Sequence, residues 1–230
     1  MGRPQVKLVK NALDVLASIA MVAAGIAILT VYWPRLFPPS KDRVVLPREP
    51  ILLTDVPTKG STSASAVLVI YSDFQCPYCG RFGREVLPHL EKTYVETGRL
   101  QIAFKHFPLK RIHPIAPAAA ELSQCAANSK RFWEVHDALF ALPKLATRDQ
   151  VDGVGRDFGL QPDDVEACAQ AGVRRLIQQQ LEEGLKLGLT ATPTVFVGRR
   201  EGAGVRLLHH LIGAKPAAEY DALLEKILQK

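Results

Sequence analysis

The sequence has no glycine-rich phosphate loop, no paired-carboxylate motif and no run of Lys and Arg interleaved with aromatic residues. These absences leave nucleotide and acid–base sites unsupported, and they give no support to a nucleic-acid-binding surface. No internal repeat or low-complexity tract is present, and the net charge of +6 is mild for 230 residues. A hydrophobic content of 47% is enough to build a real core. We therefore expect a globular chain that does not bind nucleic acid.

Cysteine is scarce as well, with four residues in the chain, Cys76, Cys79, Cys125 and Cys168. Cys76 and Cys79 form a CxxC motif, which could be half of a zinc site, but a second ligand pair at zinc spacing is missing. His209 and His210 are consecutive on a predicted strand, where neighbouring side chains point to opposite faces. They therefore cannot bind one metal ion together. We expect no metal and no cofactor other than the cysteines themselves.

The longest uncharged stretch, residues 15–33, is 19 residues long and ends in Tyr32 and Trp33. A helix of that length nearly crosses the hydrocarbon core of a bilayer, about 30 Å thick, and aromatic rings suit the headgroup level. We predict a membrane anchor over 12–33 after a cytoplasmic tail of residues 1–11. A cleaved signal peptide and a buried soluble helix are the alternatives. Basic residues flank both ends, so charge alone does not set the orientation.

After the anchor, residues 34–65 are rich in proline and small polar residues and are interpreted as a linker, with a possible edge strand over 50–54. Residues 66–71 form an apolar, β-branched run that predicts a buried central strand. A helix is expected from 76 to 97, kinked at Pro88 and stopped by Gly98. Residues 100–107 then predict a second strand. Strand, helix and strand make one βαβ unit.

From 113 to about 187 the pattern is helical throughout. Thr147 and Gln150 are spaced as a capping box, and Pro162 suits the first turn of another helix. Strands are predicted over 194–197 and 207–212, and a last helix over 217–229. The expected fold class is α/β, with a small mixed sheet flanked by helices in a domain of residues 66–230 that contains an all-helical insertion at 113–187.

The placement of Cys76 and Cys79, directly after a buried strand and at the start of a helix, has a chemical reason. Unpaired N–H groups and the helix dipole favour the thiolate of Cys76, and Pro77 costs no hydrogen bond in a first helical turn. We expect Cys76 to be the exposed nucleophile and Cys79 the shielded resolving thiol. Pro193 opens a predicted strand, and X-Pro bonds are the usual place for a cis peptide.

These motifs resemble the DsbA-like branch of the thioredoxin superfamily over about residues 65–230. The matching segments are 71–79 around the CxxC motif, 105–109, the alanine-rich helix before Cys125, Phe132-Trp133 with His136, and 188–193. The resemblance implies that Cys76 attacks, that Cys79 resolves and that the Thr192–Pro193 bond is cis. It also implies that the backbone of Thr192 pairs with an extended substrate peptide; Pro77 and Tyr78 are further candidates for substrate contact.

Two positions depart from that family. A buried carboxylate often stands six residues before the first cysteine, where this chain has Ile70, so proton transfer to Cys79 lacks that route; Asp73 is a candidate substitute. The strongest oxidants of the family have His between the cysteines, where this chain has Tyr78. The departure implies a less acidic Cys76 and a less oxidising disulfide.

Cys125 and Cys168 both fall in the helical insertion. Two free buried thiols are one interpretation; in an oxidising compartment a structural disulfide is favoured. This pair and the active pair together place residues 34–230 outside the cytoplasm. Among the remaining candidates, Trp133 is expected to be core. His106, His113 and His136 could line the groove beside the cysteines, with ordinary packing or solvent exposure as the default.

The sequence thus predicts a membrane-anchored, extracytoplasmic thiol–disulfide oxidoreductase that acts on cysteine-containing exported proteins. The expected recycling partner is a quinone-linked membrane oxidase if the protein donates disulfides, or a membrane reductant if it breaks them. A tethered reductase or isomerase for a dedicated client and a copper-handling thiol module remain as alternatives.

Overall fold

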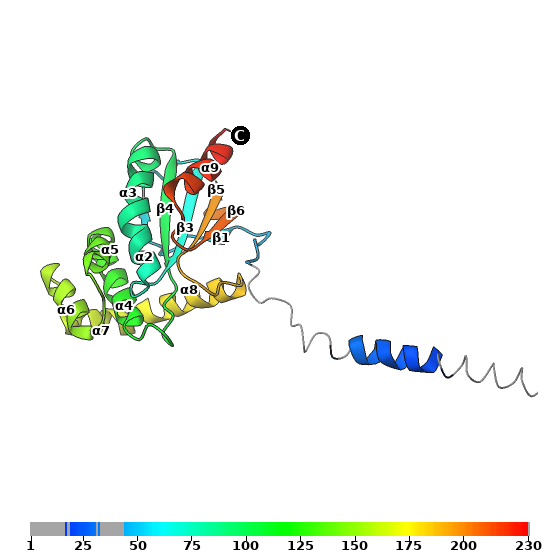
Figure 1. Ribbon diagram of the computed structural model, residues 1–230. Coiled ribbons are helices and arrows are strands. Elements are labelled where there is room, and N and C mark those ends of the chain that lie inside the picture. The colour runs from blue at the N-terminus through cyan, green and yellow to red at the C-terminus, as the bar shows by residue number, and fades with distance from the viewer. Residues whose placement is uncertain (1–16, 18, 31, 33–43, 230) are drawn as a thin grey trace, which may run out of the picture. The chain divides into compact units, whose positions relative to one another are not determined.

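The computed structural model describes residues 17, 19–30, 32 and 44–229 (Figure 1). The chain divides into two units, residues 1–43 and residues 44–230. In the first unit the described residues are helical, and their large apolar side chains, such as Met21 and Val22, are exposed. Among the described residues, no helix has both the length and the hydropathy needed to span a bilayer. The remainder of the predicted anchor 12–33, the predicted tail and residues 34–43 of the predicted linker lie outside the described residues.

The second unit is built on a six-stranded sheet in the order β1-β6-β5-β3-β4-β2. The strands are β1 (Ile51–Leu52), β2 (Thr58–Lys59), β3 (Ala66–Ser72), β4 (Leu100–His106), β5 (Thr194–Glu201) and β6 (Gly204–Ile212). Strands β3 and β4 pair in parallel, as the predicted βαβ unit requires, and β5 and β6 extend the sheet from β3 in antiparallel fashion. Every residue of β3 and β4 is buried, because helices cover both faces. The two-residue strand β2 was not predicted.

The segment between β3 and β4 is a helix interrupted by π turns rather than the single kinked helix that the sequence predicts. It consists of α2 (Pro77–Arg81), η1 (Phe82–Val86), α3 (Leu87–Leu90) and η2 (Glu91–Val95). The N–H of Leu87 donates to the carbonyl of Phe82, five residues back, just before Pro88. Because Pro88 has no N–H and its ring clashes with the carbonyl four residues earlier, widening the preceding turn accommodates it. Gly98, at φ +73°, ends the segment as predicted.

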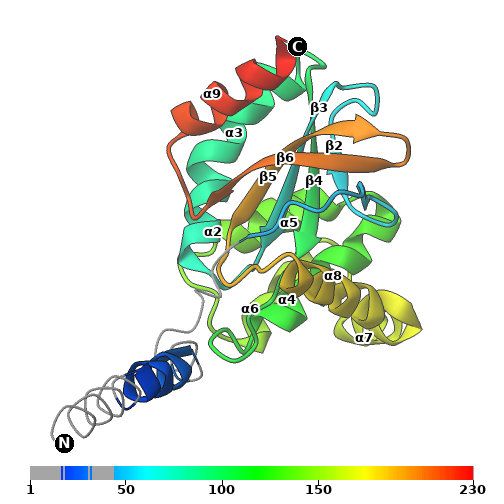
Figure 2. The ribbon, with the colours of Figure 1, turned by 90° about the vertical axis from the view of Figure 1, so that its right-hand side faces the viewer.

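The helical insertion is confirmed, with its elements lying together in Figures 1 and 2. They are α4 (Ala116–Ala126), η3 (Ala127–Ser129), α5 (Phe132–Ala141), α6 (Arg148–Asp157), α7 (Pro162–Cys168), η4 (Ala169–Val173) and α8 (Arg174–Lys186). The capping box of Thr147 and Gln150 is present at the start of α6, and Pro162 occupies the first turn of α7. The last helix is α9 (Ala217–Leu228), which lies beside α3 in Figure 2.

Three apolar clusters hold these layers together. On one face of the sheet, Leu68 and Ile70 of β3 pack against Phe82 and Tyr220 from the covering helices. On the other face, Tyr71, Phe107 and Phe196 pack beneath the end of α8. The third cluster is built around Phe74 and Phe104 with side chains of the insertion, and it includes both Cys76 and Cys79. The cysteine pair therefore lies where the sheet meets the insertion.

Candidate active site

Cys76 is the N-cap residue of α2, and Pro77 follows in the first helical turn. The N–H of Cys76 donates to the carbonyl of Asp73, and the N–H of Gly80 donates to the carbonyl of Cys76. The turn after β3 and the helix start are thus joined by backbone hydrogen bonds on both sides of the cysteine. This local geometry matches the sequence-based expectation, because a buried strand followed by a proline in the first helical turn leaves few other conformations.

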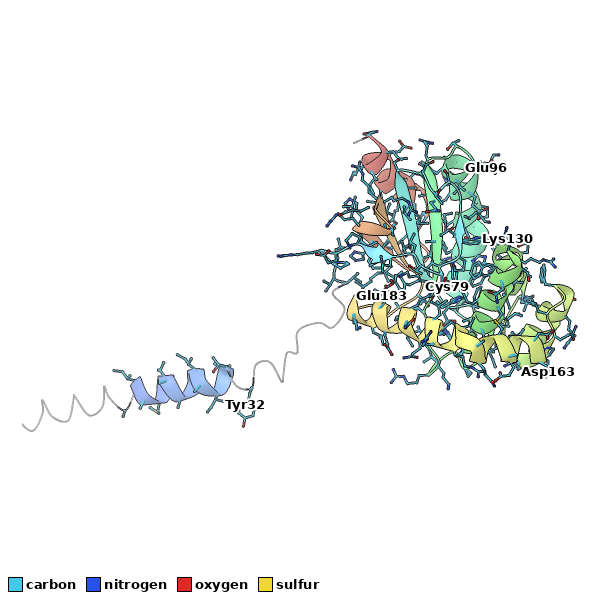
Figure 3. All side chains as sticks on the ribbon, turned by 180° about the vertical axis from the view of Figure 1, so that it is seen from behind. Tyr32, Cys79, Glu96, Lys130, Asp163 and Glu183 are labelled. Carbon is cyan, nitrogen blue, oxygen red and sulfur yellow. A yellow bond between two sulfur atoms is a disulfide. The ribbon has the colours of Figure 1, made fainter. Side chains whose placement is uncertain are left out.

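The prediction that Cys76 is exposed is wrong. Its exposed fraction is 6%, against 1% for Cys79. The covering group is the loop that ends at Thr192, whose backbone oxygen lies 3.4 Å from Sγ of Cys76. Figure 3 shows Cys79 deep between the sheet and the insertion. Cys76 remains the more accessible thiol, and it is reached through the pocket that it lines.

The pKa values of the two thiols are displaced in opposite directions. The pKa of Cys76 is lowered to about 6, first because the thiol of Cys79 donates a hydrogen bond to it. A hydrogen bond from the side chain of Thr192 and the backbone N–H groups of Tyr78 and Cys79 lower the pKa of Cys76 further, against the opposing effect of burial. Burial raises the pKa of Cys79 well above its usual range, and the neighbouring Cys76 raises it further. The pair is therefore one thiolate and one neutral thiol near neutral pH.

The shielded thiol has polar neighbours of its own. The backbone N–H of Asp73 lies 3.5 Å from Sγ of Cys79, and a hydrogen bond from Ser72 partly offsets the rise in the pKa of Cys79. Ile70, the position where the related family often has a carboxylate, is buried among apolar side chains. No carboxylate is thus present at that position to accept a proton from Cys79.

The other predicted substrate-contacting residues lie around Cys76. The Thr192–Pro193 peptide bond is cis, and Thr192 is buried against the nucleophile. Pro77 lines the pocket that leads to Cys76. Tyr78 is 56% exposed, with the guanidinium of Arg81 5.5 Å from its ring centre. The roles assigned to these residues stay predictions.

Asp73 makes hydrogen bonds around the active site that the sequence did not predict. Its buried carboxylate accepts hydrogen bonds from the backbone N–H groups of Gln75 and Leu109, both at 2.8 Å, and contacts Nδ1 of His113 at 2.9 Å. Asp73 thus connects the turn before Cys76 to the loop after β4, and His113 is more than packed or solvated. The one local signal is an Asp two residues before Gln75, a spacing that suits a side-chain-to-backbone turn.

The other residues considered in the sequence make no hydrogen bond to Cys76 or Cys79 in the structure. His106 and His136 are buried in the aromatic cluster, and burial lowers the pKa of His106 to about 4. Trp133 packs there too and donates from Nε1 to the carbonyl of Thr58. Cys125 and Cys168 are joined in a disulfide between α4 and α7. Within the described part of the chain, no three His, Cys, Asp or Glu side chains converge in a way that could hold a metal ion.

Comparison with known proteins agrees with this geometry. Residues 54–209 match the thioredoxin family. Among curated proteins, the chain is 31% identical over 168 residues to the Na⁺/H⁺ antiporter NhaA 3 of Salinispora tropica, covering 72% of this chain and 25% of the antiporter. It is 34% identical over 146 residues to the Na⁺/H⁺ antiporter NhaA 1 of Mycolicibacterium vanbaalenii, covering 60% of this chain and 22% of that protein. The chain thus spans about a quarter of the length of the curated relatives that it matches.

Solved structures show the same fold. Wolbachia pipientis α-DsbA1 superposes with a TM-score of 0.66 at 21% identity, covering 83% of this chain and 96% of that protein. BdbD from Bacillus subtilis has a TM-score of 0.65 at 18% identity, covering 79% of this chain and 97% of BdbD. For the catalytic domain of Proteus mirabilis ScsC the TM-score is 0.62 at 20% identity, with 88% of this chain and 97% of that domain covered. At these identities the likeness concerns the fold.

Proposed function

We propose that this chain, which belongs to the thioredoxin family and has a DsbA-like fold, is a thiol–disulfide oxidoreductase that oxidises cysteine pairs in exported proteins from a position on the outer face of a bacterial cytoplasmic membrane. The observation that carries the proposal is the opposite displacement of the two thiol pKa values, lowered for Cys76 and raised for Cys79. A stable Cys76 thiolate favours the reduced form of the pair, and a pair whose reduced form is favoured is an oxidant.

The proposed reaction proceeds in two exchanges. A client thiolate attacks Sγ of Cys76 in the oxidised protein, the Cys76–Cys79 bond breaks, and Cys79 leaves as a thiolate that takes up a proton. A second client thiolate then attacks the client sulfur of the mixed disulfide and expels the Cys76 thiolate. The client loses two electrons and forms one disulfide, and the protein gains the two electrons as a dithiol. A membrane partner, a quinone-linked oxidase, would remove those electrons.

Roles for the neighbouring residues follow from their places around Cys76. The carbonyl of Thr192 lies beside the nucleophile and would pair with an N–H of an extended client backbone, a local case of strand addition. Pro193 has no N–H, so it offers no competing donor at that point. Pro77 and Tyr78 would contact the client from the start of α2.

Membrane attachment is the second part of the proposal. The helical residues 19–30 carry large apolar side chains that are exposed, including Ile19, Met21, Val22 and Ile26. Exposed apolar side chains of this kind suit a lipid environment. Residues 12–33 would anchor the chain, and the disulfide between Cys125 and Cys168 favours an oxidising compartment for residues 34–230. No transport activity is proposed, because the matched segment is only a quarter of the antiporters.

The experiment that tests the function is client trapping. In the full-length Cys79→Ala chain the Cys76 thiolate can still attack client disulfides, the reverse of the proposed exchange, but no second thiol is present to release the client. Mixed disulfides between Cys76 and its clients should therefore accumulate and appear on non-reducing gels of acid-quenched cells. Cys76→Ala is the matched control and should trap none. Equal trapping by the two variants would contradict the assignment of the nucleophile. Equilibration of the wild-type pair with glutathione then separates an oxidase from a tethered reductase, which would show a more reducing potential.

A further inference from the structure

A pocket of about 510 Å³ opens beside Cys76 on the side of the helical insertion. Its walls come from three segments that are far apart in the sequence: the start of α2, the loop after β4 that contains Ile112 and His113, and the end of α5 with the loop that follows it. Thr192 is not part of these walls. The pocket therefore offers a client segment a surface that is separate from the contact at Thr192.

The lining of the pocket is mixed, and part of it is apolar. Leu139 and Phe140 of α5 are buried and form part of its floor. Ile112 stands at the rim with 63% of its surface exposed, although it is a large aliphatic side chain. An exposed aliphatic residue next to an apolar floor indicates a surface on which another apolar side chain can be buried.

The charged side chains that line the pocket have one sign only. Arg84 and Lys144 line it, and no Asp or Glu does. The guanidinium of Arg84 is fixed in place, because Nη1 donates to the carbonyl of Phe140 at 2.6 Å. Arg84 also borders a smaller cavity together with Glu91, which pairs with Lys59, and with Asp137. Within the described residues, neither Arg84 nor Lys144 forms an ion pair. Both cations are thus free to meet an anionic group.

We propose that this pocket binds the residues on one side of the client cysteine, and that it selects a client segment with a large aliphatic side chain and a carboxylate within two or three residues of that cysteine. The inference rests on the proposed function, since it names the client chemistry of the same site. The aliphatic side chain would be buried against Ile112 and Phe140. The carboxylate would pair with Arg84, whose planar guanidinium suits bidentate binding, and with Lys144 at the rim.

The test measures how fast reduced peptides with one cysteine react with the oxidised full-length protein. Two peptide pairs are compared, Cys-Leu-Glu against Cys-Leu-Lys and the reversed order Glu-Leu-Cys against Lys-Leu-Cys, each capped at both ends. In one of the two orders the Glu peptide should react about three- to tenfold faster than the Lys peptide, after correction for the thiolate fraction of each peptide. The preference should shrink in 1 M salt, because partly exposed ion pairs are screened.

Two double variants, each of which removes two positive charges, test whether the preference for the Glu peptide depends on Arg84 and Lys144. Arg84→Gln with Lys144→Gln should bring the rate ratio to within about twofold of one. Lys110→Gln with Arg111→Gln removes two exposed cations of the loop after β4 that do not line the pocket, and it should keep the preference. Arg84→Lys retains the charge and should also keep it, which separates the effect of charge from any shift of α5.

A preference absent in both peptide orders, or unchanged in the Arg84 and Lys144 double variant, would overturn the inference and leave the proposed function standing. If none of the peptides reduces the Cys76–Cys79 disulfide, the proposed function itself fails.

Discussion

Nδ1 of His113 lies 2.9 Å from Oδ2 of Asp73, so a histidine from the loop after β4 is held by a carboxylate from the turn before Cys76. The side chain of Asp73 is fully buried, whereas that of His113 is 16% exposed at the edge of the pocket beside Cys76. The same carboxylate accepts the N–H groups of Gln75 and Leu109. One side chain therefore sets the position of two of the segments that surround the nucleophile.

Asp73→Ala should lower the free energy of unfolding by about 3 kcal/mol, because it leaves three partly buried donors without an acceptor and each hydrogen bond to a charged group contributes about 1.5–3 kcal/mol. Asp73→Asn retains one acceptor oxygen and should cost less. Urea unfolding at neutral pH measures both. Asp157→Ala, at an exposed position in the last turn of α6, is the control and should change stability by no more than about 0.5 kcal/mol. Equal losses for Asp73→Ala and the control would show that the buried contacts contribute nothing.

The thiolate of Cys76 should titrate with a midpoint near pH 6, as followed by ultraviolet thiolate absorbance in the reduced protein. Since the hydrogen bond from Cys79 is the largest cause of the lowered pKa, Cys79→Ala should raise the midpoint. Cys79→Ser retains a donor and should raise the midpoint less. A midpoint that is the same in wild type and Cys79→Ala would assign the lowered pKa to the helix start and to Thr192 instead.

The same titration makes the stability of the reduced protein depend on pH. The folded pKa of Cys76 is about 6, below the value of about 8.5 expected for the unfolded chain, so the folded state holds fewer protons between these values. Stability should therefore rise from about pH 6 to pH 8 and be lost as the pH falls through 6. Melting curves of the reduced protein against Cys76→Ser measure the difference, which should be absent when both proteins are compared below pH 5.

Much of the fold was predictable because its signals are local. The apolar run before Cys76, the proline after it and the capping box at Thr147 each act over a few residues, and each gives the predicted element. The burial of Cys76 was not predictable in the same way. It depends on Thr192, which is 116 residues away in the sequence, and no periodic pattern records that contact.

The other differences between the sequence-based predictions and the structure concern features that are short or that depend on residues far apart in the sequence. Strand β2 has only two residues, too few for an alternating pattern to be visible. The part played by Asp73 depends on Leu109 and His113, which the fold brings to it from the far end of β4. The charges of Arg84 and Lys144 are evident in the sequence, but their meeting at one pocket requires α5 to pack against the helix that follows Cys76.

Two glycines in helices offer a matched test of packing. A Cβ at Gly184 in α8 would lie 2.6 Å from a ring carbon of Phe107, whereas at Gly153 in α6 the nearest neighbour is the end of the Arg156 side chain at 3.9 Å. Gly184→Ala should destabilise the protein by about 1–3 kcal/mol, because the Phe107 ring must shift in a packed core. Gly153→Ala should instead stabilise it by about 0.5–1 kcal/mol through helix propensity. Thermal melting distinguishes the two signs, and a stabilising Gly184→Ala would mean that Phe107 can move freely.

The disulfide between Cys125 and Cys168 should act on stability and leave the chemistry of Cys76 nearly unchanged. It closes a span of 43 residues, and in the chain-entropy model a loop of that length contributes about 4 kcal/mol by restricting the unfolded chain. The double variant Cys125→Ala with Cys168→Ala should therefore lower the free energy of unfolding by about 3–4 kcal/mol, measured by urea unfolding with Cys76 and Cys79 oxidised.

The pKa of Cys76 in the same double variant should stay near 6, because none of the groups that lower it belongs to α4 or α7. A loss below about 1 kcal/mol would show that the unfolded chain is already compact across this span. A displaced Cys76 pKa would show instead that the insertion shifts against the sheet once α4 and α7 are no longer joined.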